Sequence, residues 1–315
     1  MNEIGSGGSP HRKVDWWVYV VFAFALAQLA LFLVLRVRPG MIGVMLWYVG
    51  PVGLSLVTLV LIVAAVVWSA RRRPFWTPSR GVGYLIAVVI MLVSGTAYRV
   101  YPSSFDGAPS QVEFRVPLDG AVTVAWGGPT REVNYHAVHP DQRWAYDLLV
   151  TEDGNSHRGT GDRLEDYYAY GRPVLAPAAG TVRAVLDGEP DSPVGRRRGP
   201  TRVAGNHVVL EVAPNEFLFV NHLQPGTLSV RVGDRVNAGQ ELGRVGNSGS
   251  SSEPHVHIHL QSAPRLHLAE GIPLYFHCYR QGGNLVRRGM PTGGMENDSF
   301  VGHVVEHVPA CRPDR

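Results

Sequence analysis

Three long stretches without a charged side chain occupy the first third of this sequence. They cover residues 16–35, 41–70 and 81–98. Because an α-helix rises about 1.5 Å per residue, about 20 apolar residues are needed to cross a hydrocarbon layer about 30 Å thick. Runs of this length are too long for the core of a globular domain. They predict transmembrane helices and exclude a single compact soluble domain.

We expect the three helices at residues 16–35, 51–70 and 81–98. The full second run exceeds the bilayer thickness, and Pro51 suits the first turn of a helix, so we expect that helix to begin there. A cleaved signal peptide is the competing interpretation of the first run, but its apolar region would span only about 7–15 residues. Residues 16–101 are therefore interpreted as a membrane anchor.

The charges of the chain divide in the same way. Residues 1–105 hold nine Lys and Arg against two acidic residues, whereas the remainder holds 20 basic and 24 acidic residues. Short loops rich in Lys and Arg stay in the cytoplasm, so the tail at residues 1–15 is expected inside and the carboxy-terminal part outside. The uncharged runs favour a role as an anchor in a lipid bilayer over transport. The mildly acidic second part makes a nucleic-acid partner unlikely on charge grounds.

In the second part of the chain, short β-branched stretches alternate with Gly, Pro and Asn, which is typical of an all-β fold. Residues 102–120 are rich in Pro, Ser and Gly and are interpreted as a linker. We expect the folded domain at residues 121–265 and a carboxy-terminal extension at residues 266–315. Two polar stretches, 151–169 and 188–204, are expected to be long loops that border a binding site.

The most informative cluster is formed by His255, His257 and His259, which alternate with apolar residues. On a strand these three side chains share one face, with neighbours about 6–7 Å apart. A solvent-exposed strand face would explain this pattern without any function. A divalent metal ion with a water or substrate beside it is the alternative, since imidazole is a common metal ligand.

The neighbouring motifs favour the metal. Together they resemble the lysostaphin-type (LytM-like) zinc metalloendopeptidases, which cut peptidoglycan peptides, over about residues 122–262. The motifs are Tyr170 to Val182, Gly205-Asn206-His207, Asn221-His222-Leu223, Val232 to Gly243, Gly246 to Gly249 and Pro254 to His257. This resemblance implies a mainly β soluble domain, a small antiparallel β-sheet metallopeptidase fold with a groove, preceded here by three transmembrane α-helices.

The resemblance also implies roles for individual residues. His257 matches a zinc ligand, His255 and His222 match catalytic histidines, and Asp147 matches the ligand carboxylate. With two His and one Asp, Zn²⁺ keeps an open position for a water, lowers its pKa to about 7 and polarises the scissile carbonyl. The two catalytic histidines would transfer the proton and stabilise the oxyanion, and which of them does which stays open.

The first zinc ligand is where the chain departs from the common pattern. Relatives place a histidine four residues before the aspartate, but this position is Arg143. His136 and His139 stand upstream. We prefer His136, because Asn134-Tyr135-His136 followed by Gln142-Arg143 resembles a variant segment of the family. His139 stays open as the alternative.

These observations predict a membrane-anchored zinc metalloendopeptidase that hydrolyses peptide bonds of cell-wall peptidoglycan. Its expected substrates are stem or cross-link peptides, and its expected place is the bacterial cytoplasmic membrane, as a multi-pass protein with an extracytoplasmic catalytic domain. The alternative is a non-hydrolytic regulator of a separate wall hydrolase with the same fold. The sequence indicates no particular protein partner.

Four further features need an interpretation. His303, Glu306 and His307 match an inverted zincin motif, but that motif needs a helix, which the intervening valines and Pro309 disfavour. His259 is expected to act behind the ligands or in the groove, whereas His157 and His207 are expected in loops or at the surface. The acidic residues between Asp162 and Asp166 are expected to be solvated. Cys278 and Cys311 either form a disulfide in an oxidising compartment or are free thiols.

Overall fold

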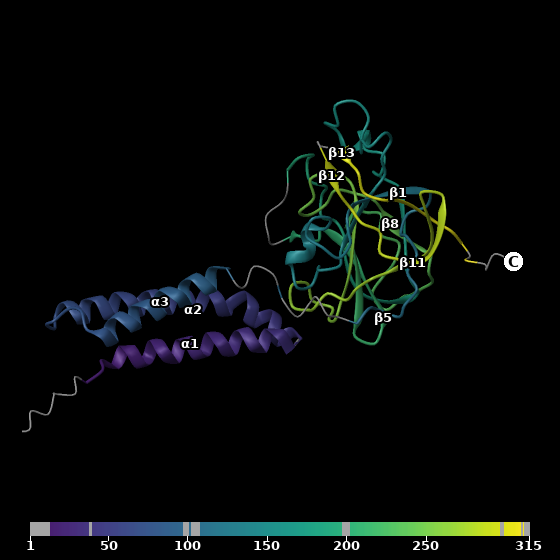
Figure 1. Ribbon diagram of the computed structural model, residues 1–315. Helices are drawn as coiled ribbons and strands as arrows, with labels where there is room; N and C mark the ends of the chain where they lie inside the picture. The colour runs from purple at the N-terminus through teal and green to yellow at the C-terminus, as the bar shows by residue number, and fades with distance from the viewer. Residues whose placement is uncertain are drawn as a thin grey trace, which may run out of the picture. The chain divides into compact units, whose positions relative to one another are not determined.

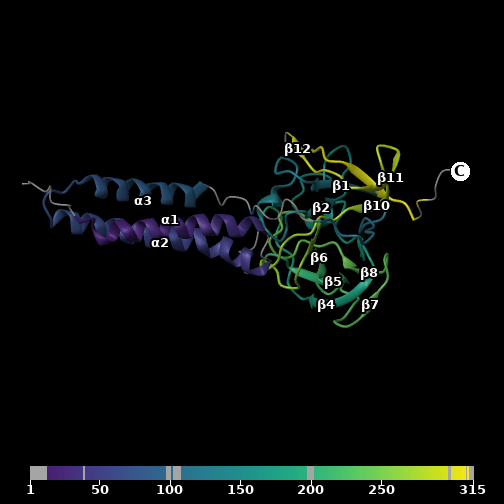
Figure 2. The same cartoon turned by 60° about the horizontal axis from the view of Figure 1, so that its bottom comes forward.

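The computed structural model of the chain forms two compact units, residues 1–99 and 100–315, each described by itself (Figures 1 and 2). The described residues are 13–37, 40–96, 101, 108–196, 202–296, 299–309 and 311. The expected tail up to residue 12, the end of the third expected helix at 97–98, residues 102–107 of the expected linker and 197–201 of an expected loop lie outside them.

The first unit consists of three helices, as expected. These are α1 (Trp16–Val34), extended by the short 3-10 helix η1 (Leu35–Val37), α2 (Met41–Ala70) and α3 (Pro78–Thr96). All three are long and apolar enough to cross a membrane. Their apolar composition leaves the backbone no polar partner in lipid except its own helical hydrogen bonds.

The expected start of the second helix at Pro51 is wrong, because α2 begins at Met41 and Pro51 lies inside it. Proline costs a helix one backbone hydrogen bond, and transmembrane helices tolerate this where neighbouring groups compensate. The preference of proline for the first helical position acts instead at Pro78, which begins α3. Thr77 precedes it and accepts the backbone N–H of Arg80 on Oγ1 at 3.3 Å.

Small residues and polar contacts both contribute to the packing of the helices. A Cβ on Gly83 of α3 would lie 2.6 Å from the Trp17 ring of α1, so the glycine permits this close contact. Ser94 of α3 donates to the side-chain oxygen of Gln28 of α1 at 3.2 Å. Both features join α1 to α3 without charged groups.

The second unit is mainly antiparallel β-structure, which confirms the expected fold class. Its largest sheet has the strand order β11-β10-β14-β1-β2-β9-β6-β5-β4-β7, and two small sheets pair β12 with β13 and β3 with β8. The strands are β1 (Ala121–Trp126), β2 (Tyr146–Leu149), β3 (Pro173–Leu175), β4 (Gly180–Leu186), β5 (Asn206–Ala213), β6 (Glu216–Leu223), β7 (Arg235–Val236), β8 (Glu241–Arg244), β9 (Val256–Gln261), β10 (Phe276–Gln281), β11 (Asn284–Gly289), β12 (Met295–Glu296), β13 (Ser299–Phe300) and β14 (Val304–His307).

The strand β9 lies between β2 and β6, and its apolar residues alternate with histidines. Val256, Ile258 and Leu260 are buried in the main apolar core. The histidines between them face the other way, as side chains on a strand must. The register places His257 opposite Asp147 of β2. The sheet itself thereby brings two expected metal ligands together.

The folded unit is larger than residues 121–265. Phe114, Val116 and Leu118 are buried in its core, so the second half of the expected linker belongs to the fold. The strands β10, β11 and β14 of the expected extension join the large sheet, with β14 paired to β1. A disulfide joins Cys278 to Cys311, with a Cα separation of 5.3 Å. Whether these segments join the fold therefore depends on their alternating apolar residues and not on their turn-forming residues.

Candidate metal centre

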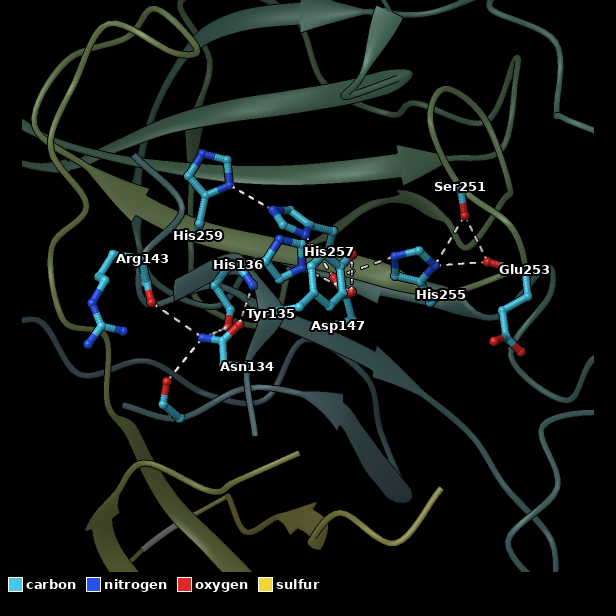
Figure 3. A network of polar contacts seen from close by, with 12 residues as sticks. Asn134, Tyr135, His136, Arg143, Asp147, Ser251, Glu253, His255, His257 and His259 are labelled. Atoms are coloured by element: carbon cyan, nitrogen blue, oxygen red, sulfur yellow. Dashed lines mark hydrogen bonds and ion pairs between the residues drawn. The ribbon is translucent and has the colours of Figure 1, made fainter. Parts of the chain in front are cut away.

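Three buried residues meet at one point of the β unit. They are His136 of the 3-10 helix η3 (Tyr135–Val138), Asp147 of β2 and His257 of β9, and one ligand atom from each lies within 4.8 Å of the others. Asp147 Oδ2 is 3.0 Å from Nε2 of His136, and Asp147 Oδ1 is 2.8 Å from Nδ1 of His257 (Figure 3). Ligand atoms around a tetrahedral zinc ion lie roughly 3.3 Å apart, so the cluster has a suitable size.

The loop before β2 brings His136 into this cluster. The side chain of Asn134 accepts the backbone N–H of His136 at 3.1 Å. Its amide nitrogen donates to the carbonyls of Gly128, Arg143 and Ala145, which ties the loop back onto the sheet. His139 follows at the end of η3 and is not part of the cluster.

Arg143, which stands where relatives place the first ligand, has a structural role. It donates from Nη2 to the carbonyl of Pro129 at 2.6 Å, and its guanidinium lies 4.4 Å above the Trp144 ring. Burial lowers its pKa to about 10. Arg143 thus holds the loop whose other end presents His136.

A chain of hydrogen bonds behind His257 fixes the position of its proton. The amide nitrogen of Gln261 donates to the carbonyls of Ala263 at 2.6 Å and Arg265 at 3.0 Å, so the amide oxygen faces His259. His259 must then donate from Nε2 to that oxygen, at 3.2 Å, and its Nδ1 is an acceptor. His257 therefore donates from Nε2 to Nδ1 of His259 at 2.9 Å.

This proton position leaves two lone pairs facing each other. Nδ1 of His257 and Oδ1 of Asp147 are 2.8 Å apart, and neither carries a proton in this arrangement. A proton on Nδ1 would join them, but burial, reinforced by His136 and opposed by the hydrogen bond to Asp147, lowers the pKa of His257 to about 4. A divalent cation at this point would resolve the conflict at neutral pH. Two histidines and one carboxylate are a ligand set of catalytic zinc.

The carboxylate of Asp147 is charged. Burial alone would raise the pKa of Asp147, but the charges and hydrogen bonds of His136 and His255 outweigh burial and hold the pKa well below its usual range. A buried carboxylate that is ionised and surrounded by imidazoles attracts a cation.

His222 stands at the carboxy-terminal end of β6 in a strained backbone conformation, with φ of +63°. Such strain persists only where the surrounding structure imposes it, and it is frequent at functional sites. Here the backbone N–H of His222 donates to Ala204 at 3.1 Å, and its carbonyl accepts from Gly246 at 3.0 Å. Nδ1 of the ring donates to the carbonyl of Ser248 at 2.8 Å, which leaves Nε2 as the acceptor.

His255 directs its ring toward the same point. Its Nδ1 donates to the carbonyl of Glu253 at 2.8 Å, and its Nε2 is 3.5 Å from Oδ1 of Asp147. The ring centre lies 4.8 Å from that of His222. Burial opposes protonation of His255, but Asp147 and Glu253 raise its pKa. Burial, together with His255 and His257, holds the pKa of His222 well below its usual range.

A cavity of about 330 Å³ opens beside these side chains. Asp147, His222 and His255 line it together with Tyr135 and Glu253. Tyr135 was not predicted as a site residue; its hydroxyl donates to Oδ2 of Asp147 at 3.1 Å. Its position directly before a ligand histidine was the available signal, because neighbouring residues of a tight 3-10 turn can both reach one carboxylate.

The remaining sequence motifs lie outside the centre. The segment around Glu306 is strand β14 and not a helix, so the inverted zincin motif does not form; His303 accepts the Thr292 N–H at 2.9 Å instead. His207 contacts the carbonyl of Gly205, and His157 packs against a tyrosine ring. Among the described residues, neither belongs to the metal cluster.

A mainly antiparallel β unit with two histidines and an aspartate around one point, and two more histidines beside them, defines a candidate metallopeptidase site. Residues 163–266 match the model of peptidase family M23. This match confirms the resemblance to lysostaphin-type peptidases. It includes His222, His255 and His257, whereas His136 and Asp147 lie before it.

Individual relatives are similar over limited stretches. The chain is 39% identical over 62 residues to endolysin 2638A of Staphylococcus phage 2638A, which is 19% of this chain and 13% of that protein. It is similar to the catalytic domain of lysostaphin from Staphylococcus simulans, with 20% identity, a TM-score of 0.29, and coverage of 48% of this chain and 86% of the other. A zinc-containing peptidase from Vibrio cholerae has 21% identity, a TM-score of 0.32, and coverage of 48% and 36%.

Proposed function

We propose that the chain is a membrane-anchored zinc metalloendopeptidase that hydrolyses peptide bonds of cell-wall peptidoglycan. The observation that carries the proposal is the pairing of His257 Nδ1 with Asp147 Oδ1, whose lone pairs face each other at 2.8 Å beside His136. The family match over residues 163–266 supports the peptidase chemistry.

His136 Nε2, Asp147 and His257 Nδ1 would hold the ion. When bound there, Zn²⁺ supplies a Lewis acid that lowers the pKa of a water and polarises the scissile carbonyl. His222 and His255 stand on the cavity side of the ligands, each with Nδ1 engaged by a backbone carbonyl. Their Nε2 atoms, that of His255 lying 3.5 Å from Oδ1 of Asp147, would then take up the proton of the attacking water, pass a proton to the leaving amine, or donate to the developing oxyanion.

The three helices support an anchor in the bacterial cytoplasmic membrane. The Arg and Lys distribution favours a cytoplasmic amino-terminal tail and an extracytoplasmic β unit. The Cys278–Cys311 disulfide supports the same orientation, because disulfides persist in oxidising compartments. Peptidoglycan close to the membrane would then be the accessible substrate.

The test uses the full-length chain in detergent micelles with one equivalent of Zn²⁺. Incubation with purified peptidoglycan is expected to release new amino termini, identified by mass spectrometry. His222→Ala is expected to keep zinc and lose about 100-fold or more in rate. His277→Ala, which removes a histidine on β10 far from the cluster in the strand order, is the matched control and is expected to act like the wild type. Full zinc occupancy without cleavage would favour the non-hydrolytic regulator.

A further inference from the structure

The cavity beside the candidate metal centre has both polar and apolar lining residues. The polar ones include Asp147, His222 and His255. The apolar ones are Ala125, Trp126, Leu149, Met295 and Phe300, and the last two are here called the hairpin wall. Met295 is 44% exposed. A methionine exposed to this extent does not serve to pack the core. Apolar lining combined with a few polar groups is the usual composition of a pocket that orients a ligand.

Two of these apolar residues come from the hairpin of β12 and β13, which lies outside the segment that matches the peptidase family. Met295 pairs with Phe300 across the hairpin. The ribbon shows this hairpin beside the loops at one end of the β unit (Figure 1). The chain therefore builds part of its cavity from residues that the family match does not include.

The hairpin is docked on β1, the strand that neighbours the ligand strand β2. Gly293 donates to the carbonyl of Gly127 at 3.0 Å, and Gly294 donates to that of Ala125 at 2.9 Å. A Cβ on Gly293 would lie 2.4 Å from Cα of Trp126, and one on Gly302 would lie 1.9 Å from the carbonyl of Val124. Only glycine at both ends permits this contact, since backbone atoms cannot move aside.

We propose that Met295 and Phe300 form an apolar subsite that selects peptides with an apolar side chain beside the scissile bond over peptides with glycine there. This inference rests on the proposed function and names its substrate class. Met295 and Phe300 line the same cavity as His222 and His255, so a substrate whose carbonyl lies between the two histidines would have its neighbouring residue within that cavity beside the hairpin wall. An alanine or larger side chain covers that wall, whereas glycine leaves it in contact with water.

The size of the effect follows from the number of carbon atoms buried. One methyl or methylene group in an apolar pocket changes kcat/KM by about 10-fold or more. The full-length wild type is therefore expected to cleave a blocked peptide with alanine beside the scissile bond about 10-fold better than the matched peptide with glycine at that position.

Three variants test the assignment. Met295→Ala and Phe300→Ala remove the wall and are expected to lower the alanine-to-glycine ratio of kcat/KM toward one. Gly293→Val displaces the hairpin from β1 and is expected to do the same. Leu285→Ala, which truncates an exposed apolar residue on β11, is the matched control and is expected to keep the wild-type ratio.

Binding of the same two peptides to the metal-free full-length chain, measured by calorimetry, gives a readout that does not need catalysis. Tighter binding of the alanine peptide, lost in Met295→Ala, supports the subsite. An equal affinity for both peptides, or a wild-type ratio in all three variants, overturns it. Absence of cleavage by the zinc-loaded wild type, combined with selective binding, overturns the proposed hydrolysis and leaves the subsite standing.

Discussion

Nε2 of His257 lies 2.9 Å from Nδ1 of His259, two residues along the same strand. Because the amide of Gln261 is oriented by two backbone carbonyls, this contact has one direction only: His257 donates and His259 accepts. The relationship extends the proposed metal site beyond its three candidate ligands, since it determines which nitrogen of His257 has a lone pair available.

Replacing Gln261 with methionine removes the oxygen that orients His259 while keeping a side chain of similar length. We expect zinc affinity to fall about 10- to 100-fold, as measured by competition with a chelator. Gln111→Met, at an exposed glutamine, is the control and is expected to keep the wild-type affinity.

The tautomer of His257 shows whether Gln261 orients the histidines or only stabilises the fold. Long-range ¹H–¹⁵N NMR of the metal-free protein with labelled histidines is expected to show His257 protonated at Nε2, and Gln261→Met is expected to shift that population toward Nδ1. A variant that unfolds more easily but keeps the Nε2 proton would refute the orienting role of Gln261.

The Cys278–Cys311 disulfide closes a loop across a sequence separation of 33 residues and lies next to the pairing of β10 with β14. A loop of this length stabilises the folded state by about 3–4 kcal/mol, mainly by restricting the unfolded chain. The Cys278→Ala, Cys311→Ala double variant is expected to lose on the order of 10 °C in Tm of the β unit, as measured by scanning calorimetry. Reduction of the wild type should reproduce this loss, and an unchanged Tm after complete reduction would contradict it.

The pair of Asp141 and His267 predicts a pH dependence of stability. His267 donates its backbone N–H to Asp141 Oδ2 at 2.7 Å, with its ring nitrogen 3.4 Å from the same oxygen. This contact raises the pKa of His267, and it outweighs burial to lower the pKa of Asp141, on which His259 also acts.

The two shifts define a window of maximal stabilisation. The contribution of Asp141 is present above its ordinary pKa of 3.8 and is lost as pH falls through its lowered value. The contribution of His267 is present below its ordinary pKa of 6.5 and is lost as pH rises through its raised value. His267→Ala is therefore expected to lower Tm most near pH 5.5 and least well above neutrality.

His277→Ala is the matched control for this titration. Burial, with Arg288, lowers the pKa of His277 against the opposing charge of Glu113, so its removal should help the folded state at acid pH. If both variants changed Tm in the same direction across the pH range, the contact with Asp141 would not raise the pKa of His267.

The sequence alone predicts the class of the fold because periodicity and length are local properties. The alternation around Val256 and Ile258 predicts a strand with its histidines on one face, and the uncharged runs predict the helices. The position of Pro51 misleads, because a proline at the first helical position and one inside a transmembrane helix leave the same local signal. The boundary at residue 265 misleads because strand pairing between β1 and β14 joins residues about 180 positions apart.

In the candidate metal centre, too, some residues can be predicted from local sequence and others cannot. The spacing indicates a histidine face on one strand, and the resemblance indicates His257, Asp147 and His222, since all three follow local motifs. The choice between His136 and His139 depends on Asn134, whose side chain bonds to three distant carbonyls, and this cannot be read from spacing. Gln261 has no motif of its own, and its role emerges only from the direction of three consecutive hydrogen bonds.

The central claim is that His136, Asp147 and His257 hold one metal ion. Its most direct test is the zinc content per chain of the full-length protein in micelles, measured by inductively coupled plasma mass spectrometry after dialysis. We predict one zinc per chain for the wild type and for His139→Ala, and far less than one for His136→Ala and His257→Ala. One zinc per chain retained in His257→Ala, or lost in His139→Ala but not in His136→Ala, would contradict the account.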